Sequence, residues 1–302
     1  MRGAARTRLA GAAVVAGLVG AAGFIGLTRP DPLPADAMAG LEGDATAGAA
    51  VFWAGGCASC HAAPGARGDD RLVLAGGRRL ETEFGTFIAP NVSPDPDHGI
   101  GGWTAAQFAS AMVRGVSPGG QHYYPAFPWT SYRNATLQDM ADLKAYMDTL
   151  PPSEATSEDH ALRFPYSIRR GIGLWKRAAT PDGWAVEGEL TEAEARGRYL
   201  AEALAHCGEC HTPRDRFGVL DRSRWLAGAP NPSGDGRIPD ITPSALTWSA
   251  GEVAGYLASG FTPDFDTAGG SMAAVVASLA ELPSEDLEAI AAYLARVPPS
   301  AP

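Results

Sequence analysis

The longest apolar segment of the chain lies near its N-terminus, where Leu9 to Leu27 contain no charged side chain. A proline-rich stretch follows at positions 30–34, and three arginines precede the segment: Arg2, Arg6 and Arg8. An uncharged segment of about 20 residues is just long enough to cross a bilayer as a helix, and the arginines favour the cytoplasmic side. We expect residues 1–37 to form a signal anchor and tether that export the rest of the chain. A cleaved signal peptide is the alternative.

Beyond residue 42 the apolar positions indicate short helices, and the pattern occurs twice. Each copy has a middle helix that begins after Trp-Thr or Trp-Ser and ends at a glycine, Gly115 or Gly260. Each copy closes with a helix that runs into Pro-Pro, Leu137–Leu150 or Leu282–Val297. No stretch sustains the alternation of apolar and polar residues that a half-buried strand needs. The pattern predicts an all-α chain with little sheet.

The two copies define the expected domains, residues 42–152 and 190–300, which we call the first and second repeats. Residues 153–189 join them and contain too many apolar side chains for a free linker. We expect this segment to be a strap with a short helix packed on the domains. Its basic residues could pair with propionates or membrane phosphates, or form a solvated face; they include Arg169, Arg170, Lys176 and Arg177.

All four cysteines of the chain lie in two copies of one motif, Cys57-Ala58-Ser59-Cys60-His61 and Cys207-Gly208-Glu209-Cys210-His211. Cys-x-x-Cys-His is the attachment signature of c-type haem: each cysteine adds to a vinyl group and the histidine ligates the iron. A zinc site would need ligands from paired motifs, and a redox dithiol favours a single motif in a βαβ context. The sequence therefore predicts two covalently bound haem c groups.

The irons of an electron carrier need a second axial ligand, commonly a methionine sulfur from a loop before the last helix. In the second repeat Met272 lies on such a glycine-rich loop. In the first repeat, His122 has the same spacing from its haem histidine, whereas the other two registers place Phe127 or Pro125 there, and neither can ligate iron. We predict His122 as the ligand, with Met140 or an open site as alternatives. The remaining histidines are expected to be structural or exposed: His98, His160 and His206.

The formal net charge of the chain is −10, and a basic nucleic-acid footprint is absent. An acidic surface would steer a partner that carries a basic patch. The expected partners are therefore proteins rather than nucleic acid.

With these motifs, the chain resembles the membrane-associated dihaem cytochromes c that serve periplasmic alcohol, gluconate and aldehyde dehydrogenases. The segments that carry the resemblance are the two haem motifs, residues 89–96, residues 124–132 and residues 269–272. Several such subunits have a methionine ligand where this chain has Phe127. The resemblance implies class I cytochrome c domains, in which the first and last helices cross at Gly48 and Gly197 against two tyrosines, Tyr146 and Tyr293.

The resemblance also implies a periplasm-facing carrier at the bacterial inner membrane, which takes electrons from a dehydrogenase. Its acceptor would be an oxidase or another cytochrome. A bis-histidine first haem would have a lower potential than a His/Met second haem, so electrons would enter at the first repeat and leave at the second. The competing interpretations are a dihaem peroxidase or a gas sensor, each of which would use an open first haem.

Overall fold

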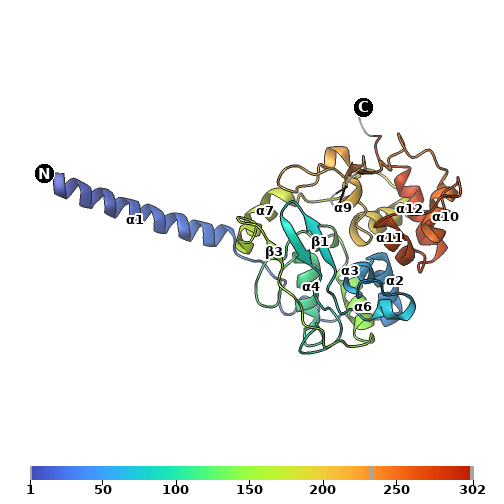
Figure 1. Ribbon diagram of the computed structural model, residues 1–302, viewed down its shortest axis with the longest axis horizontal. Helices are drawn as coiled ribbons and strands as arrows, with labels where there is room; N and C mark the ends of the chain where they lie inside the picture. The colour runs from blue at the N-terminus through green and yellow to red at the C-terminus, as the bar shows by residue number, and fades with distance from the viewer. Residues whose placement is uncertain (1, 232–233, 235, 300–302) are drawn as a thin grey trace.

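The computed structural model describes residues 2–231, 234 and 236–299, and gives only the helical backbone for residues 2–10. The side chains of Arg2, Arg6 and Arg8, and the expected domain end at residue 300, lie outside the described residues. Helix α1 (Arg2–Leu27) projects from the body of the molecule (Figure 1). Over the part of the chain that is described, no helix is both long and apolar enough to span a bilayer.

In the first repeat, helix α2 (Ala45–Ala54) packs against helix α6 (Leu137–Met147). Gly48 lies where the two helices meet, because a Cβ atom there would overlap the backbone carbonyl of Asp142 and the Cβ of Tyr146. The ring of Tyr146 packs beside Phe52, with centroids 5.2 Å apart. The small residue thus allows the close contact of these helices.

The second repeat has the same contact between helix α8 (Glu192–Arg198) and helix α12 (Ser284–Leu294). Here Gly197 meets the carbonyl of Ala289 and the Cβ of Tyr293. A π-helical segment, η3 (Tyr199–Leu204), extends α8 toward the second haem motif. The expected roles of Gly48, Gly197 and the two tyrosines at these contacts agree with the geometry.

The other helices of each repeat are short and lie, along the chain, between its first and last helices. The two middle helices begin with capping boxes, at Thr104 and Ser249, and end at glycines with positive φ. The remaining helices of the repeats are α3 (Cys57–His61), η1 (Gly68–Leu72), α4 (Ala105–Arg114), α5 (Trp129–Tyr132), α9 (Gly208–His211), η4 (Arg222–Arg224), α10 (Ala250–Ser259) and α11 (Met272–Leu279). Helix α11 was not expected, since its residues follow a glycine-rich stretch that indicated a loop.

The strap carries η2 (Arg169–Gly171) and α7 (Ile172–Ala179), which lie at the base of α1 (Figure 1). It also supplies β3 (Ala161–Leu162) to a small antiparallel sheet with β2 (Gly85–Ile88) and β1 (Arg79–Thr82). A second pair joins β4 (Ala229–Pro230) to β5 (Arg237–Ile238). The all-α expectation was therefore incomplete, because strands of two to four residues are too short to show a period-2 pattern.

The buried apolar side chains of both repeats form one continuous cluster. It includes Phe52 and Leu143 from the first repeat and Leu200 and Ile290 from the second. Helix α11 of the second repeat consequently lies beside the first repeat, where it contacts both α2 and α3 (Figure 1). This shared core fixes the relative positions of the two haem motifs.

Candidate haem-binding sites

In both motif histidines the ring nitrogen nearer the backbone has the same kind of hydrogen-bond partner, the carbonyl of a proline. Nδ1 of His61 lies 2.9 Å from the carbonyl oxygen of Pro90, and Nδ1 of His211 lies 2.9 Å from that of Pro239. A carbonyl can only accept, so Nδ1 carries the hydrogen and Nε2 is left as a lone-pair donor. Burial lowers the pKa of both imidazoles, and the carbonyl contact opposes this shift only in part. Both rings are thus neutral, with a fixed tautomer whose Nε2 could bind a metal.

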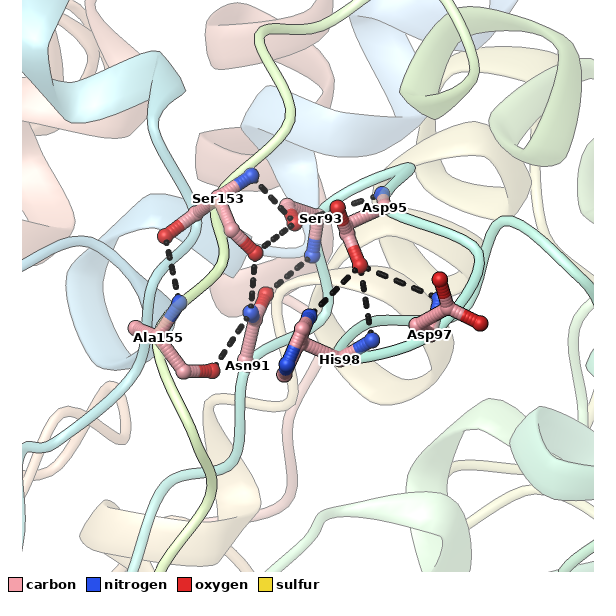
Figure 2. Close-up of polar contacts among 7 residues, drawn as sticks. All are labelled: Asn91, Ser93, Asp95, Asp97, His98, Ser153 and Ala155. Carbon is pink, nitrogen blue, oxygen red and sulfur yellow. Dashed lines mark hydrogen bonds and ion pairs between the residues drawn. The ribbon is translucent and has the colours of Figure 1, made fainter.

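Asn91, the residue after Pro90, is buried and lies at the centre of a polar network (Figure 2). The side-chain amide of Asn91 donates to the carbonyls of Ser153 and Ala155, at 2.7 and 2.9 Å, and its oxygen accepts from the N–H of Ser93 at 2.9 Å. Asn91 therefore ties the start of the strap to the loop that faces His61. In the second repeat the corresponding Asp240 accepts from the N–H of Thr242 at 2.8 Å.

None of the four cysteines forms a disulfide, so all four sulfurs are available to bond a cofactor. Burial raises the pKa of Cys57 and of Cys207 to about 12, and raises that of Cys60 and Cys210 as well. An unreacted thiol at these positions is accordingly neutral. Cys57, Cys60 and His61 lie on α3, whereas Cys207 is the N-cap of α9, which holds Cys210 and His211. Nearby, the N–H groups of Gly76 and Gly228 donate to the carbonyls of His61 and His211, both at 2.7 Å. The two motifs therefore share one geometry, and their donor sets fit a covalently attached haem with a proximal imidazole.

The third motif residue, just before the second cysteine, contacts the other repeat in both copies. The hydroxyl of Ser59 lies 3.2 Å from the Ala274 carbonyl and 3.2 Å from the Ser278 hydroxyl, both on α11. The carboxylate of Glu209 accepts from Thr130 at 2.7 Å and from Ser131 at 3.3 Å, both on α5. Arg214 forms an ion pair with the same carboxylate. Each haem motif is thus part of the contact between the repeats.

A second group joins the residues that precede the two motifs. Nε2 of His206, whose backbone has a positive φ of 44°, lies 3.3 Å from the carbonyl of Gly55. The hydroxyl of buried Tyr132 donates to the same carbonyl at 3.1 Å, and its ring packs edge-on against His206 at 5.7 Å. Burial and the neighbouring thiols and Glu209 raise the pKa of Tyr132, which therefore stays neutral. The sequence did not indicate this role, because it depends on contacts of His206 with the other repeat.

Each repeat has the same short loop pairing after its middle helix, and these pairings allow the two repeats to be aligned. Val116 pairs with His122 in the first repeat, and Phe261 pairs with Thr267 in the second. The carbonyls of the glycines that end the middle helices also have equivalent donors: Gly115 accepts from the N–H of Tyr123, and Gly260 accepts from that of Ala268. When this alignment is continued along the chain, Phe127 of the first repeat is the position equivalent to Met272 of the second. Met272 is half-buried as the first residue of α11 and packs against the core.

His122 is only 4 % exposed and lies beside the strap. Its Nε2 is 2.9 Å from the carbonyl of Thr28, and a Cβ atom on Gly173 would touch the same nitrogen. Its Nδ1 is buried and has no hydrogen-bond partner among the described residues. Burial lowers the pKa of this imidazole. Ligation by His122 therefore stays a prediction, and only its Nδ1 is without a partner among the described residues.

Comparison with known proteins agrees with this geometry. A cytochrome c family model matches residues 45–151. A dihaem c-type cytochrome of Cereibacter sphaeroides is 59% identical over 293 residues, which cover 97% of this chain and 98% of that protein. The chain belongs to the dihaem c-type cytochromes. The cytochrome accordingly holds two covalently bound haem c groups.

More distant relatives of this cytochrome are subunits of larger assemblies. The fructose dehydrogenase cytochrome subunit of Gluconobacter japonicus is 38% identical over 252 residues, which cover 81% of this chain and 51% of the subunit. The cytochrome c subunit of a quinone alcohol dehydrogenase from Gluconacetobacter polyoxogenes is 34% identical over 270 residues, covering 84% of this chain and 56% of the subunit. The cytochrome thus spans about half the length of these dehydrogenase subunits.

Proposed function

We propose that this cytochrome is a periplasm-facing electron carrier that accepts electrons from a dehydrogenase and passes them to an oxidase or another cytochrome. The observation that carries the proposal is the direct packing of one haem motif against the other repeat, through Ser59 and Glu209. Two redox centres held by one rigid core suit transfer within a single molecule. The similarity to dehydrogenase cytochrome subunits supports the donor class.

We assign the haem contacts residue by residue. Cys57 and Cys60 hold one group and Cys207 and Cys210 the other; when bound, the haems supply a reversible one-electron change at iron. The proximal ligands are His61 and His211, which the carbonyls of Pro90 and Pro239 orient. Such outer-shell acceptors increase the basicity of an imidazole ligand. The distal ligand of the second group is Met272.

For the first group we keep His122 as the proposed distal ligand. The support is chemical: it is an imidazole on the loop that precedes the last helix of its repeat, and Phe127, which occupies the register position of Met272, cannot ligate iron. A bis-histidine site has a lower potential than a His/Met site, so the first repeat would receive electrons and the second would deliver them.

We further propose that α1 holds the cytochrome at the outer face of the inner membrane. The side chains described on this helix are exposed and apolar, among them Val14, Leu18 and Ile25. Exposed side chains of this kind on a projecting helix favour burial in lipid.

Low-temperature EPR spectroscopy combined with a redox titration tests the carrier proposal. We expect two low-spin ferric signals, two separate potentials and little binding of carbon monoxide to the reduced protein. A high-spin signal in the untreated protein, with carbon monoxide bound at one haem, would contradict the proposal and favour peroxide or gas chemistry. Equal potentials at the two haems would contradict the proposed direction of transfer.

A further inference from the structure

The middle of the strap, residues 161–179, is the most basic part of an acidic protein, although the strap as a whole is not basic. Between His160 and Thr180 the chain has five basic residues and no acidic residue, although the net charge of the whole chain is −10. These basic residues are Arg163, Arg169, Arg170, Lys176 and Arg177. Such separation of charge within one chain indicates a surface that is built for an anionic partner.

None of these five side chains forms an ion pair with a carboxylate among the residues that the structure describes. Their partners are uncharged oxygens instead. Lys176, for example, donates to the carbonyls of Arg114 and Gly115, and Arg169 donates to the carbonyl of His122 while covering the ring of Tyr124. The charge of Asp31 acts on Lys176, but the carboxylate of Asp31 pairs with Arg114 at 3.7 Å. The positive charge of residues 161–179 is therefore not balanced by carboxylates in direct contact with them.

Large apolar side chains are exposed between these cations. Phe164 is 81 % exposed, the most of any on the strap, and three others are about half exposed: Tyr166, Ile168 and Leu174. Phe217 of the second repeat extends the patch, since its carbonyl accepts from the indole N–H of Trp175 at 2.8 Å. Aromatic and aliphatic side chains interleaved with arginine and lysine are typical of protein surfaces that lie in the headgroup region of a bilayer.

The same arginines bind the end of α1. Arg170 donates to the carbonyl of Ile25 at 2.8 Å and to the hydroxyl of Thr28 at 3.0 Å, and Arg177 donates to the carbonyl of Leu27 at 2.9 Å. The exposed apolar helix thus leaves the body at this patch, as Figure 1 shows for α1 and α7. A membrane that receives α1 would meet the strap at its surface.

We infer that residues 163–177 form a binding surface for anionic phospholipid headgroups, with Phe164 entering the interface. This inference rests on the membrane location proposed above. The uncompensated cations attract the negatively charged lipid surface, and the exposed rings add apolar burial. The surface would orient the two haem motifs relative to the membrane.

Vesicle binding by the full-length dihaem protein tests this inference. A Phe164→Cys variant can be labelled with an environment-sensitive dye, since the four native cysteines are assigned to thioethers. Phe265→Cys is the matched control, because Phe265 is 90 % exposed in the loop between α10 and α11. On vesicles containing phosphatidylglycerol we expect a blue shift of the dye emission at position 164 only, and little shift on pure phosphatidylcholine.

Charge variants test the cation contribution. Arg163→Gln combined with Arg177→Gln should increase, on the order of tenfold, the anionic lipid needed for half of the shift. Arg224→Gln combined with Arg296→Gln changes the net charge equally at exposed positions of the second repeat and should leave the titration unchanged. An equal effect of both pairs would overturn the inference.

Flotation of the vesicles separates the two proposals. If the protein floats with neutral and anionic vesicles while the dye at 164 behaves like that at 265, the lipid-binding surface is overturned and the membrane location stands. An acidic protein would then be the partner that the charge favours. If the protein floats with neither kind of vesicle, both the location and the surface are overturned.

Discussion

The carboxylate of Glu209 accepts a hydrogen bond from the hydroxyl of Thr130 at 2.7 Å, and so links the second haem motif to helix α5 of the first repeat. Arg214 and Ser131 bind the same carboxylate, whose side chain is only 10% exposed. Both carboxylate oxygens are therefore engaged, Oε1 by the two hydroxyls of the first repeat and Oε2 by Arg214. The contact depends on a charged group that has little access to water.

Replacement of Glu209 should consequently weaken the whole molecule. We expect Glu209→Ala to lower the free energy of unfolding by about 2 kcal/mol, because Thr130 and Arg214 lose a charged acceptor. Urea unfolding followed through the haem absorption would measure the change. Glu288→Ala, at an exposed position of α12, is the control and should change little. Equal stability of the two variants would show that Glu209 contributes nothing to the contact.

Gly48 offers a test of the helix contact in the first repeat. An added methyl group would overlap the Asp142 carbonyl, so Gly48→Ala should lower the unfolding free energy by about 1–3 kcal/mol. Gly255→Ala is the matched control: no atom lies within 4 Å of its added Cβ in α10. Since alanine favours a helix interior, this control should raise stability by about 0.5–1 kcal/mol. The same sign for both variants would contradict the proposed close contact.

Asn91 should act on the first haem site through the Pro90 loop. Asn91→Ala leaves the carbonyls of Ser153 and Ala155 without their donor, and should cost about 2 kcal/mol of unfolding free energy. Asn91→Asp keeps the acceptor for Ser93 but places a carboxylate against two carbonyls, so it should be no more stable than the alanine variant. Thermal unfolding of both proteins would check this order. If Asn91→Asp were as stable as the wild type, the hydrogen bonds donated by the Asn91 amide would not contribute to stability.

His122→Ala should lower the unfolding free energy by about 1–2 kcal/mol, since it removes the Thr28 contact and leaves a buried gap. EPR spectroscopy of the same variant tests the ligand assignment. Conversion of one low-spin signal to high-spin would support His122 as the distal ligand. Two unchanged low-spin signals would assign it to the α1 junction alone, and Met140→Leu would then be examined in the same way.

The stability of the cytochrome should fall as the pH drops below about 6.5 through protonation of His160. Nδ1 of His160 accepts from the N–H of Ile88 at 3.1 Å, and burial together with Arg169 lowers its pKa. The folded state thus favours the neutral ring, so its contribution is present above pH 6.5 and is lost in acid. His160→Gln keeps an acceptor and should flatten this part of the stability profile. His98→Gln, at an exposed loop, should leave the fall unchanged.

The repeat pattern and the haem motifs could be predicted from the sequence because they rest on local signals. The capped helices that begin after Thr104 and Ser249 need only a few neighbouring residues, because helix geometry repeats over short distances. The roles of Gly48 and Gly197 at the helix contacts were implied by the resemblance instead, and the geometry agrees with them.

The remaining features depend on contacts between distant segments. The strap strand Ala161–Leu162 pairs with Gly85 and Thr86, about 75 residues earlier, and neither segment is long enough to show a strand period. The roles of Glu209 and His206 depend on the other repeat, which no motif specifies. The position of His122 beside Thr28 likewise follows from how α1 and the strap pack. Spacing from the haem histidine could not reveal this competing partner.

The reciprocal contacts of Ser59 and Glu209 have a consequence for the symmetry of the chain. In the alignment of the two repeats described above, α5 of the first repeat is equivalent to α11 of the second. Ser59 of the first haem motif contacts α11, and Glu209, at the same position of the second motif, contacts α5. An interface that uses the same patch on both partners is isologous, the form found in twofold-symmetric homodimers. The arrangement is that of a twofold-symmetric homodimer whose two subunits are joined in one polypeptide.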